Sequence, residues 1–342
     1  AVSAPAPSAF TTARLNFAGQ GFSGANPPDT VGDVGPSHYI QAINDAGGTS
    51  YIVYNKTNGS VIAGPFTLSS LGGAGACASG GGDPIVLYDE LANRWLLSEF
   101  PSSGDNLCVY ISQTADPVSG GWYNYSFTLS EFPDYPKYGV WPDAYYVGAN
   151  ESSPALYALD RTNMLVGGVA SFQRLTVPVL SAFSFQMLIP ADLDGATPPP
   201  AGSPGIFMRH RDDESHDAGS NNPAQDYLEL YSFAVDWDTP ANSTLTGPVS
   251  IPVAEFDSHL CGYVAFACIQ QQGSATTLDP LREVIMHRLP FHNFGDHQSL
   301  AGCFVTDVNG ADRAGVRWFE LRRTGLGSWS LYQEGTYSPD SH

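Results

Sequence analysis

Short runs of β-branched and aromatic residues, separated by Gly, Pro, Asn and Asp, recur along almost the whole chain. Runs of this length bounded by turn residues predict β-strands joined by tight turns, and helical periodicity is scarce. The sequence therefore predicts an all-β protein in which strand follows strand. The clearest expected strands cover residues 38–43, 50–54, 84–88, 94–98, 107–111, 144–148, 155–159, 205–209, 227–233, 284–288, 300–305, 315–321 and 329–333.

These expected strands fall into successive groups, which is typical of a repeated sheet architecture. Each group holds an Asp-containing turn, an inner strand, a hairpin and a polar outer strand. We expect a β-propeller of about five or six four-stranded units, with a two-sheet β-sandwich as the alternative. The expected units cover residues 27–68, 80–130, 134–178, 182–253 and 278–337. The expected divisions are an N-terminal extension (1–26), a single propeller domain (27–337) and a C-terminal tail (338–342).

Composition and charge limit which partners and which cellular location can be expected for this chain. A chain of 342 residues that is 42% hydrophobic can bury a large core. Its formal net charge of -20 repels nucleic acid and anionic membrane surfaces, so neither is an expected partner. No apolar stretch approaches the roughly 20 residues that span a bilayer, and the small-residue start is typical of a processed N-terminus. We therefore expect an extracellular or cell-surface protein.

Five cysteines occur in the sequence. Cys261 and Cys268 close a short loop, and Cys77 and Cys108 flank an expected hairpin, so we predict two disulfides. Such bridges belong to an oxidising compartment. Cys303 lies in an apolar run, which favours a buried, inert thiol over an intermolecular bridge.

Asn-x-Ser/Thr sequons mark candidate glycosylation sites, which would be used only in a eukaryotic secretory pathway. They begin at Asn55, Asn58, Asn124, Asn150 and Asn242.

Several segments resemble large secreted bacterial proteins with propeller-like repeats. They are residues 26–35 (NPPDTVGDVG), 82–89 (GDPIVLYD), 94–98 (RWLLS) and 132–143 (FPDYPKYGVWPD), and the resemblance extends over nearly the whole chain. The activity of that group is poorly defined, so the resemblance implies a fold and an extracellular location and no catalytic residue. It also implies that the repeat pattern continues past His342. The ring would then lack closing strands, or would close through the N-terminal segment.

One acidic loop could hold a divalent cation. Its carboxylates are hard oxygen ligands of the kind that Ca²⁺ prefers, and calcium is the one cofactor that the sequence suggests. The loop lacks the spacing of an EF-hand, so a solvated charged loop is the alternative. The candidate ligands are Asp212, Asp213, Glu214 and Asp217.

A second set of polar residues lies at the turns of the expected units. In a propeller such turns converge around the axis, so distant carboxylates can meet there and act on a glycosidic bond. An Asp in a turn commonly hydrogen-bonds its own backbone instead. The set is Asp29, Asp33, Asp83, Asp134, Asp143, His292, Asp296 and His297, of which Asp29, Asp83, Asp143, Asp296 and His297 are the catalytic candidates.

The sequence leaves three functions open. It contains no Gly-x-Ser-x-Gly elbow, no phosphate-binding loop and no His-Glu-x-x-His motif, which disfavours the enzymes built on them. The first expectation is a non-catalytic extracellular recognition or surface-structural module, with a glycan or an extracellular protein surface as partner. The second is a carboxylate-dependent, glycoside hydrolase-like enzyme. The third is a protein that self-associates through an exposed sheet edge.

Overall fold

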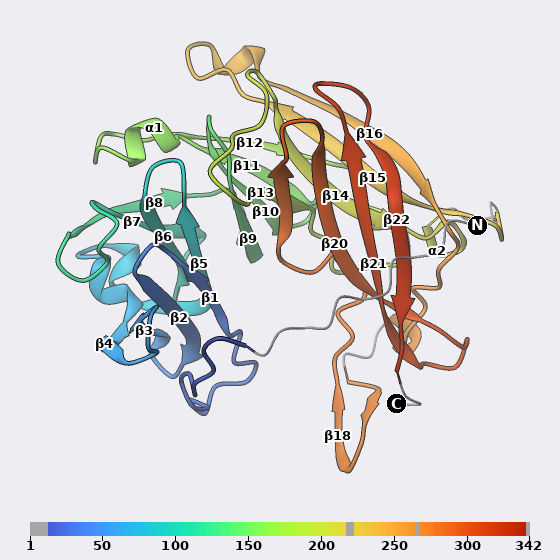
Figure 1. Cartoon of the computed structure of the whole chain (residues 1–342), viewed down its shortest axis with the longest axis horizontal. Coiled ribbons are helices and arrows are strands. Elements are labelled where there is room, and N and C mark those ends of the chain that lie inside the picture. Colours follow the sequence, from blue (N-terminus) through green and yellow to red (C-terminus); the bar gives the residue numbers. More distant parts are fainter. Residues whose placement is uncertain (1–12, 217–221, 264–266, 340–342) are drawn as a thin grey trace.

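The chain is all-β, and its first three sheets each hold four antiparallel strands in sequence order (Figure 1). A computed structural model describes residues 13–216, 222–263 and 267–339. The first sheet holds β1 (Val31–Val34), β2 (His38–Asp45), β3 (Gly48–Asn55) and β4 (Val61–Thr67). The second holds β5 (Gly80–Asp89), β6 (Arg94–Pro101), β7 (Asn106–Ser112) and β8 (Trp122–Thr128). The third holds β9 (Asp134–Val140), β10 (Tyr145–Asn150), β11 (Ala155–Leu159) and β12 (Phe172–Thr176).

The rest of the chain forms one eight-stranded sheet, ordered β16-β15-β14-β13-β19-β20-β21-β22. Its strands are β13 (Ile189–Leu193), β14 (Gly205–Arg211), β15 (Asp226–Ala234), β16 (Thr244–Val253), β19 (Leu289–Asn293), β20 (Gln298–Asp307), β21 (Ala314–Arg323) and β22 (Ser330–Tyr337). It consists of two antiparallel four-stranded halves, joined where β13 and β19 pair in parallel with Ala191 opposite Leu289. The sheet curls until its outer strands β16 and β22 make contact.

Shorter elements connect these sheets. The hairpin β17 (Ile269–Gln271) and β18 (Ser274–Leu278) projects from the segment between β16 and β19 (Figure 1). The helical turns are η1 (Leu68–Leu71), η2 (Ala76–Ala78), α1 (Arg161–Met164), α2 (Asp213–His216), η3 (Pro240–Asn242) and η4 (Cys261–Tyr263). Among the described residues, no helix has the length and apolar character needed to cross a membrane.

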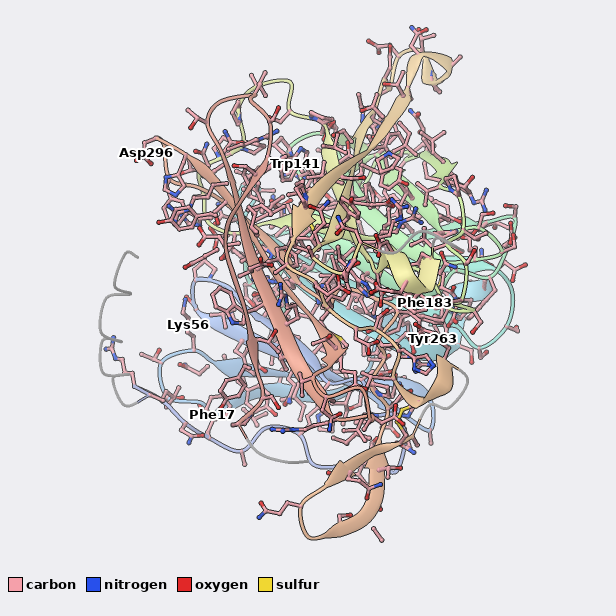
Figure 2. The ribbon with its side chains drawn as sticks, turned by 90° about the vertical axis from the view of Figure 1, so that its right-hand side faces the viewer. Phe17, Lys56, Trp141, Phe183, Tyr263 and Asp296 are labelled. Carbon is pink, nitrogen blue, oxygen red and sulfur yellow. A yellow bond between two sulfur atoms is a disulfide. The ribbon has the colours of Figure 1, made fainter. Side chains whose placement is uncertain are left out.

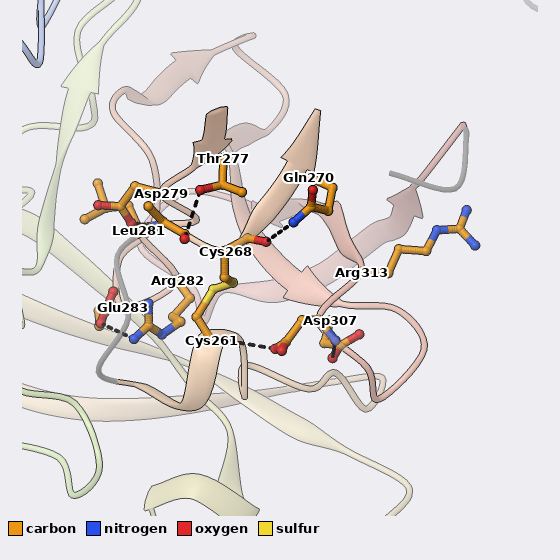
Figure 3. The surroundings of a disulfide bond; sticks show 12 residues. Cys261, Cys268, Gln270, Thr277, Asp279, Leu281, Arg282, Glu283, Asp307 and Arg313 are labelled. Carbon is orange, nitrogen blue, oxygen red and sulfur yellow. Dashed lines mark hydrogen bonds and ion pairs between the residues drawn. A yellow bond between two sulfur atoms is a disulfide. The ribbon is translucent and has the colours of Figure 1, made fainter. Parts of the chain in front are cut away.

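Both predicted disulfides are confirmed. Cys77 is bonded to Cys108 and ties η2 to β7, while Cys261 is bonded to Cys268 at the base of the β17–β18 hairpin. Figure 3 shows the second bridge beside the ion pair of Arg282 and Glu283. Cys303 is a free, half-buried thiol.

The expected all-β class and most expected strands are confirmed, and one expected strand is wrong. Residues 284–288 form no strand, and β19 begins only at Leu289. Val284 and Ile285 are fully buried, which explains the apolar signal there. A short apolar run is equally compatible with an irregular buried segment, because periodicity alone does not separate the two. The four-stranded sheets and the curled eight-stranded sheet are compatible with the expected sandwich as well as with the expected propeller.

Successive sheets pack through their first strands. β1 contacts β5, β5 contacts β9 and β9 contacts β13. Gly139 in β9 shows how close this packing is, because a Cβ atom there would lie 2.3 Å from the carbonyl oxygen of Ala191 in β13. Trp95 and Trp141 are fully buried between sheets. The first strands of the sheets are therefore the places where neighbouring sheets pack tightly against one another.

A buried acid lies between the first two sheets. Glu99 in β6 is fully buried, and its neighbour is the Thr49 hydroxyl of β3. Burial raises the pKa of Glu99 from 4.5 to about 8. The folded protein thus holds this carboxyl protonated under conditions in which the unfolded chain would ionise it.

We expect Glu99→Gln to remove a pH-dependent loss of stability. Because the folded pKa is raised, the native state keeps its full stability below about pH 4.5 and loses it as the pH rises towards 8. The loss at pH 7 is about 3 kcal/mol, and the neutral amide avoids it. In urea unfolding between pH 4.5 and 8, the free energy of unfolding of the variant should rise relative to that of the wild type as the pH rises. The exposed Glu90→Gln change is the control, and parallel curves for Glu99→Gln and wild type would contradict the assignment.

Candidate functional site

Polar side chains from four separate stretches of the chain line one small cavity. Asp29 precedes β1, Asp83 lies in β5, Tyr135 and Lys137 lie in β9, and His287 comes just before β19. The cavity, which we call the Asp83 cavity, has a volume of about 240 Å³. It forms because the first strands of successive sheets pack together, which brings the residues at their starts to one place.

The backbone repeats a special conformation around this cavity. Asp29, Asp83 and Tyr135 all have positive φ angles, of 40°, 52° and 51°. An Asp tolerates this left-handed region better than most residues, whereas a Tyr there is uncommon. Asn44 then links the first two sheets, because its Nδ2 donates to Asp29 Oδ2 at 2.7 Å and its Oδ1 accepts from the Asp83 backbone N–H at 2.9 Å. One amide side chain thus fixes both acidic residues.

The carboxyl groups of Asp83 and Asp29 form a hydrogen-bonded pair. The pKa of Asp83 is raised to about 7, mainly by burial; the ammonium of Lys137 opposes this shift and the Asp29 carboxylate adds to it. Two carboxylates in contact repel each other when both are ionised, so Asp83 keeps its proton up to near neutral pH. The cavity therefore offers both a proton donor and carboxylate acceptors.

Lys137 and His287 complete the polar lining. Lys137 Nζ lies 3.6 Å from the centre of the Tyr135 ring, and burial lowers its pKa although Asp83 and Asp29 favour the charged form. Burial, together with the charges of Lys137 and Arg288, lowers the pKa of His287 to about 3, so its imidazole is neutral at pH 7. Within the described part of the chain, His287 Nε2 has no hydrogen-bond partner.

The structure brings together only some of the predicted turn residues. Asp29, Asp83 and Asp134 gather at the starts of the first strands, since Asp134 contributes to the electrostatics of Asp83. Asp33 instead pairs with Arg288 at 3.2 Å, and Arg288 also pairs with Asp192.

The remaining predicted residues lie elsewhere. Asp143 lies in the turn between β9 and β10 and lines a different pocket. His297 Nδ1 and Asp296 Oδ1 are 2.7 Å apart, on a turn where the Asp296 side chain is 85% exposed. Figure 2 places Asp296 at the margin of the molecule. The His292 ring packs against Phe294 of this turn, with the two ring planes tilted by 43°.

Sequence reasoning missed Lys137, Tyr135 and His287. Lys137 had one visible signal. It is one of only 14 Lys and Arg residues in a chain of net charge -20, and it follows the turn-type residues Pro133, Asp134 and Pro136. His287 had none, since it was assigned to an expected strand.

The acidic loop is arranged differently from its prediction. Both carboxylate oxygens of Asp212 accept hydrogen bonds, from Ser215 and Ser258, and Asp213 accepts from the Asn222 backbone. Asp217 lies outside the described residues. The acids that gather with Asp212 are Glu214 and Asp226, whose ligand atoms lie within 4.8 Å of one another. Calcium binding at this loop stays a prediction.

Three of the sequon asparagines donate a hydrogen bond from their amide nitrogen. Asn150 Nδ2 donates to Asp134 Oδ2 at 3.2 Å, Asn124 Nδ2 to the Leu71 carbonyl at 3.3 Å, and Asn242 Nδ2 to Asp236 Oδ2 at 3.3 Å. A glycan attached at any of these nitrogens would have to coexist with that contact.

Comparison with known proteins adds no assignment: no protein family model matches the chain, and no curated protein is similar to it.

Proposed function

We propose that this chain is a non-catalytic extracellular recognition module that binds a small hydroxyl-rich ligand, such as one sugar residue of a glycan, in the Asp83 cavity. The observation that carries the proposal is the convergence of six polar or aromatic side chains, from four stretches of sequence, on that single cavity. Pockets that combine an apolar wall with a few convergent polar groups are the usual places for ligands. The two disulfides support an extracellular location.

The chemistry of the lining matches ligand hydroxyl groups. A hydroxyl both donates and accepts hydrogen bonds, and the cavity presents a carboxylate acceptor at Asp29 and donors at Lys137 and the protonated Asp83. The Tyr135 ring adds an apolar surface beside them. Because a water molecule takes up about 30 Å³, the cavity volume equals that of about eight waters, which limits the ligand to one small ring.

We also propose that the sheets are arranged as blades of a propeller around the Asp83 cavity. The contacts of β1 with β5, β5 with β9 and β9 with β13, followed by the parallel pair of β13 and β19, support this arrangement. The ion pair between Arg288 and Asp33 supports closure between the last and first units. An experimental structure with two face-to-face sheets in place of a common axis would favour the sandwich.

The experiment is a glycan array probed with the purified protein, followed by calorimetric titration of the best glycan. We expect Asp83→Asn to weaken binding at least tenfold, because the amide cannot carry the negative charge that favours the Lys137 ammonium in the cavity. Asn tolerates the positive φ at this position, so the backbone should be preserved. The exposed Asp296→Asn change is the control and should bind as the wild type does. Absence of binding to any glycan, or equal affinity of Asp83→Asn and wild type, would overturn the proposal.

One observation favours an enzyme as the second candidate. A group with a pKa of about 7, as for Asp83, is well suited to acid–base catalysis at neutral pH. Glycosidases, however, hold their two carboxyl groups about 5 to 10 Å apart, whereas Asp83 and Asp29 are in hydrogen-bond contact. Hydrolysis of an array glycan by the wild type, abolished in Asp83→Asn, would favour the enzyme over the binding module.

A further inference from the structure

A second pocket opens at the other end of β9 from the Asp83 cavity. It lies between the turn that joins β9 to β10, the 198–204 loop that joins β13 to β14, and the end of β15. Its volume is about 420 Å³, and five of its eleven lining residues are prolines or alanines of that single loop. We call it the Asp143 pocket. Its walls are thus largely apolar and conformationally stiff, since the proline ring fixes φ.

A buried tryptophan, Trp141, and a half-buried one, Trp237, hold the backbone of this pocket in place. Trp237 Nε1 donates to the carbonyl oxygen of Asp143 at 2.9 Å, and Trp141 Nε1 donates to the carbonyl oxygen of Ser203 at 3.0 Å. The hydroxyl of Tyr146 donates to Asp143 Oδ2 at 3.2 Å. The backbone of Ser203 and both the backbone and the carboxylate of Asp143 are therefore held before any ligand arrives.

Each of these two residues presents one atom without a partner. Asp143 Oδ1 and Ser203 Oγ are both buried and, across the described residues, neither makes a hydrogen bond. Ser203 is only 8% exposed. Arg161 attracts the Asp143 carboxylate, but its guanidinium is bonded to Asp89. Buried polar atoms are nearly always hydrogen-bonded in folded proteins, so two unpartnered atoms on residues that line the same pocket point to a ligand that satisfies them.

We propose that the Asp143 pocket binds a small organic cation, with its ammonium group at Asp143 Oδ1 and Ser203 Oγ and its apolar body against the prolines. An ammonium group has three N–H donors and no acceptor, which matches two unpartnered acceptor atoms. Asp143 is the one charged residue of the described lining, and the apolar walls strengthen its attraction for a cation. This site is separate from the Asp83 cavity and does not depend on the function proposed for it.

The probe pair is benzylammonium chloride and its neutral isostere benzyl alcohol, each added to ¹⁵N-labelled protein at constant ionic strength. The indole N–H signals of Trp237 and Trp141 report on the site, because both donate to residues that line it. We expect benzylammonium to shift these signals in a saturable manner and to bind at least tenfold more tightly than benzyl alcohol. The indole signal of Trp95, which is buried between other sheets, should stay unchanged.

Two variants test the assignment independently. Asp143→Asn keeps an acceptor for the Tyr146 hydroxyl but removes the charge, and it should weaken benzylammonium binding at least tenfold. Ala201→Phe fills the pocket from an exposed position without removing a hydrogen bond, and it should block binding even if Asp143→Asn folds poorly. Asp83→Asn, in the other cavity, is the control and should bind as the wild type does. Equal affinity for the two probes, full binding by Ala201→Phe, or no shift of either indole signal would overturn the proposal.

Discussion

Replacing Arg161 with Met should destabilise the protein by about 3 to 5 kcal/mol, because it leaves the carboxylate of Asp89 buried without its counter-charge. Asp89 is fully buried at the end of β5, and Arg161 reaches it from α1 through two bonds, Nε to Oδ2 at 2.7 Å and Nη2 to Oδ1 at 3.0 Å. The Tyr145 hydroxyl also donates to Asp89, at 2.9 Å. This cluster ties the second sheet to the third, so its loss should appear in the global unfolding transition.

The double variant Asp89→Asn/Arg161→Met separates the lost charge pair from lost packing. It removes the uncompensated charge together with its partner, so we expect it to be more stable than Arg161→Met alone in urea unfolding. A matched surface control is Arg322→Met, which breaks the pair between Arg322 and Glu320 where the arginine side chain is 32% exposed. That change should cost far less than Arg161→Met, because an exposed pair is screened by solvent. Equal losses at the buried and surface pairs would contradict our interpretation of the Arg161 cluster.

Replacing Trp95 with Ala should also cost about 3 to 5 kcal/mol, through loss of buried apolar area and creation of a cavity. The ring is fully buried between the first and second sheets and packs against Tyr88 with ring centres 4.8 Å apart. Its Nε1 donates to the Ala115 carbonyl at 3.1 Å, and that bond is lost as well. Gly35 lies so close that a Cβ atom there would be 2.7 Å from the ring, which shows how tightly the site is filled.

Chemical unfolding of Trp95→Ala beside Trp318→Ala measures this effect. Trp318 is 38% exposed, so its truncation leaves no enclosed cavity and should cost far less. A thermal or urea transition of Trp95→Ala that coincides with the wild-type transition would show that the ring contributes little to packing between the sheets.

The sequence predicts the all-β class and the spacing of the sheets because those depend on local pattern. Short β-branched and aromatic runs indicate strands such as β11, whose bounds Ala155–Leu159 agree with the expected 155–159. Both disulfides were predictable because each pair brackets a local loop. The parallel pairing of β13 with β19 could not be predicted, because pairing between strands that are distant in sequence leaves no local signal.

The candidate site was predictable in part. Asp29 and Asp83 lie near the starts of the first strands of two successive sheets, and the contact between those strands brings them together. Asp143, Asp296 and His297 are also titratable residues in turns of the sequence, yet these turns lie away from the Asp83 cavity. Which end of a strand a turn occupies depends on the tertiary arrangement, and residue type carries no information about it. His287 enters the cavity from an irregular segment that no periodicity describes.

The parallel pairing of β13 with β19 also affects the order in which the chain can assemble during synthesis. Each of the first three sheets is built from one contiguous stretch, so its strands can pair as soon as that stretch has left the ribosome. β13, by contrast, must wait for β19, which is made roughly a hundred residues later, and the closing of so long a loop slows folding. Until then β13 carries an open hydrogen-bonding edge, and an open edge can pair with another chain. The nascent protein is therefore most exposed to misassembly between the synthesis of these two strands.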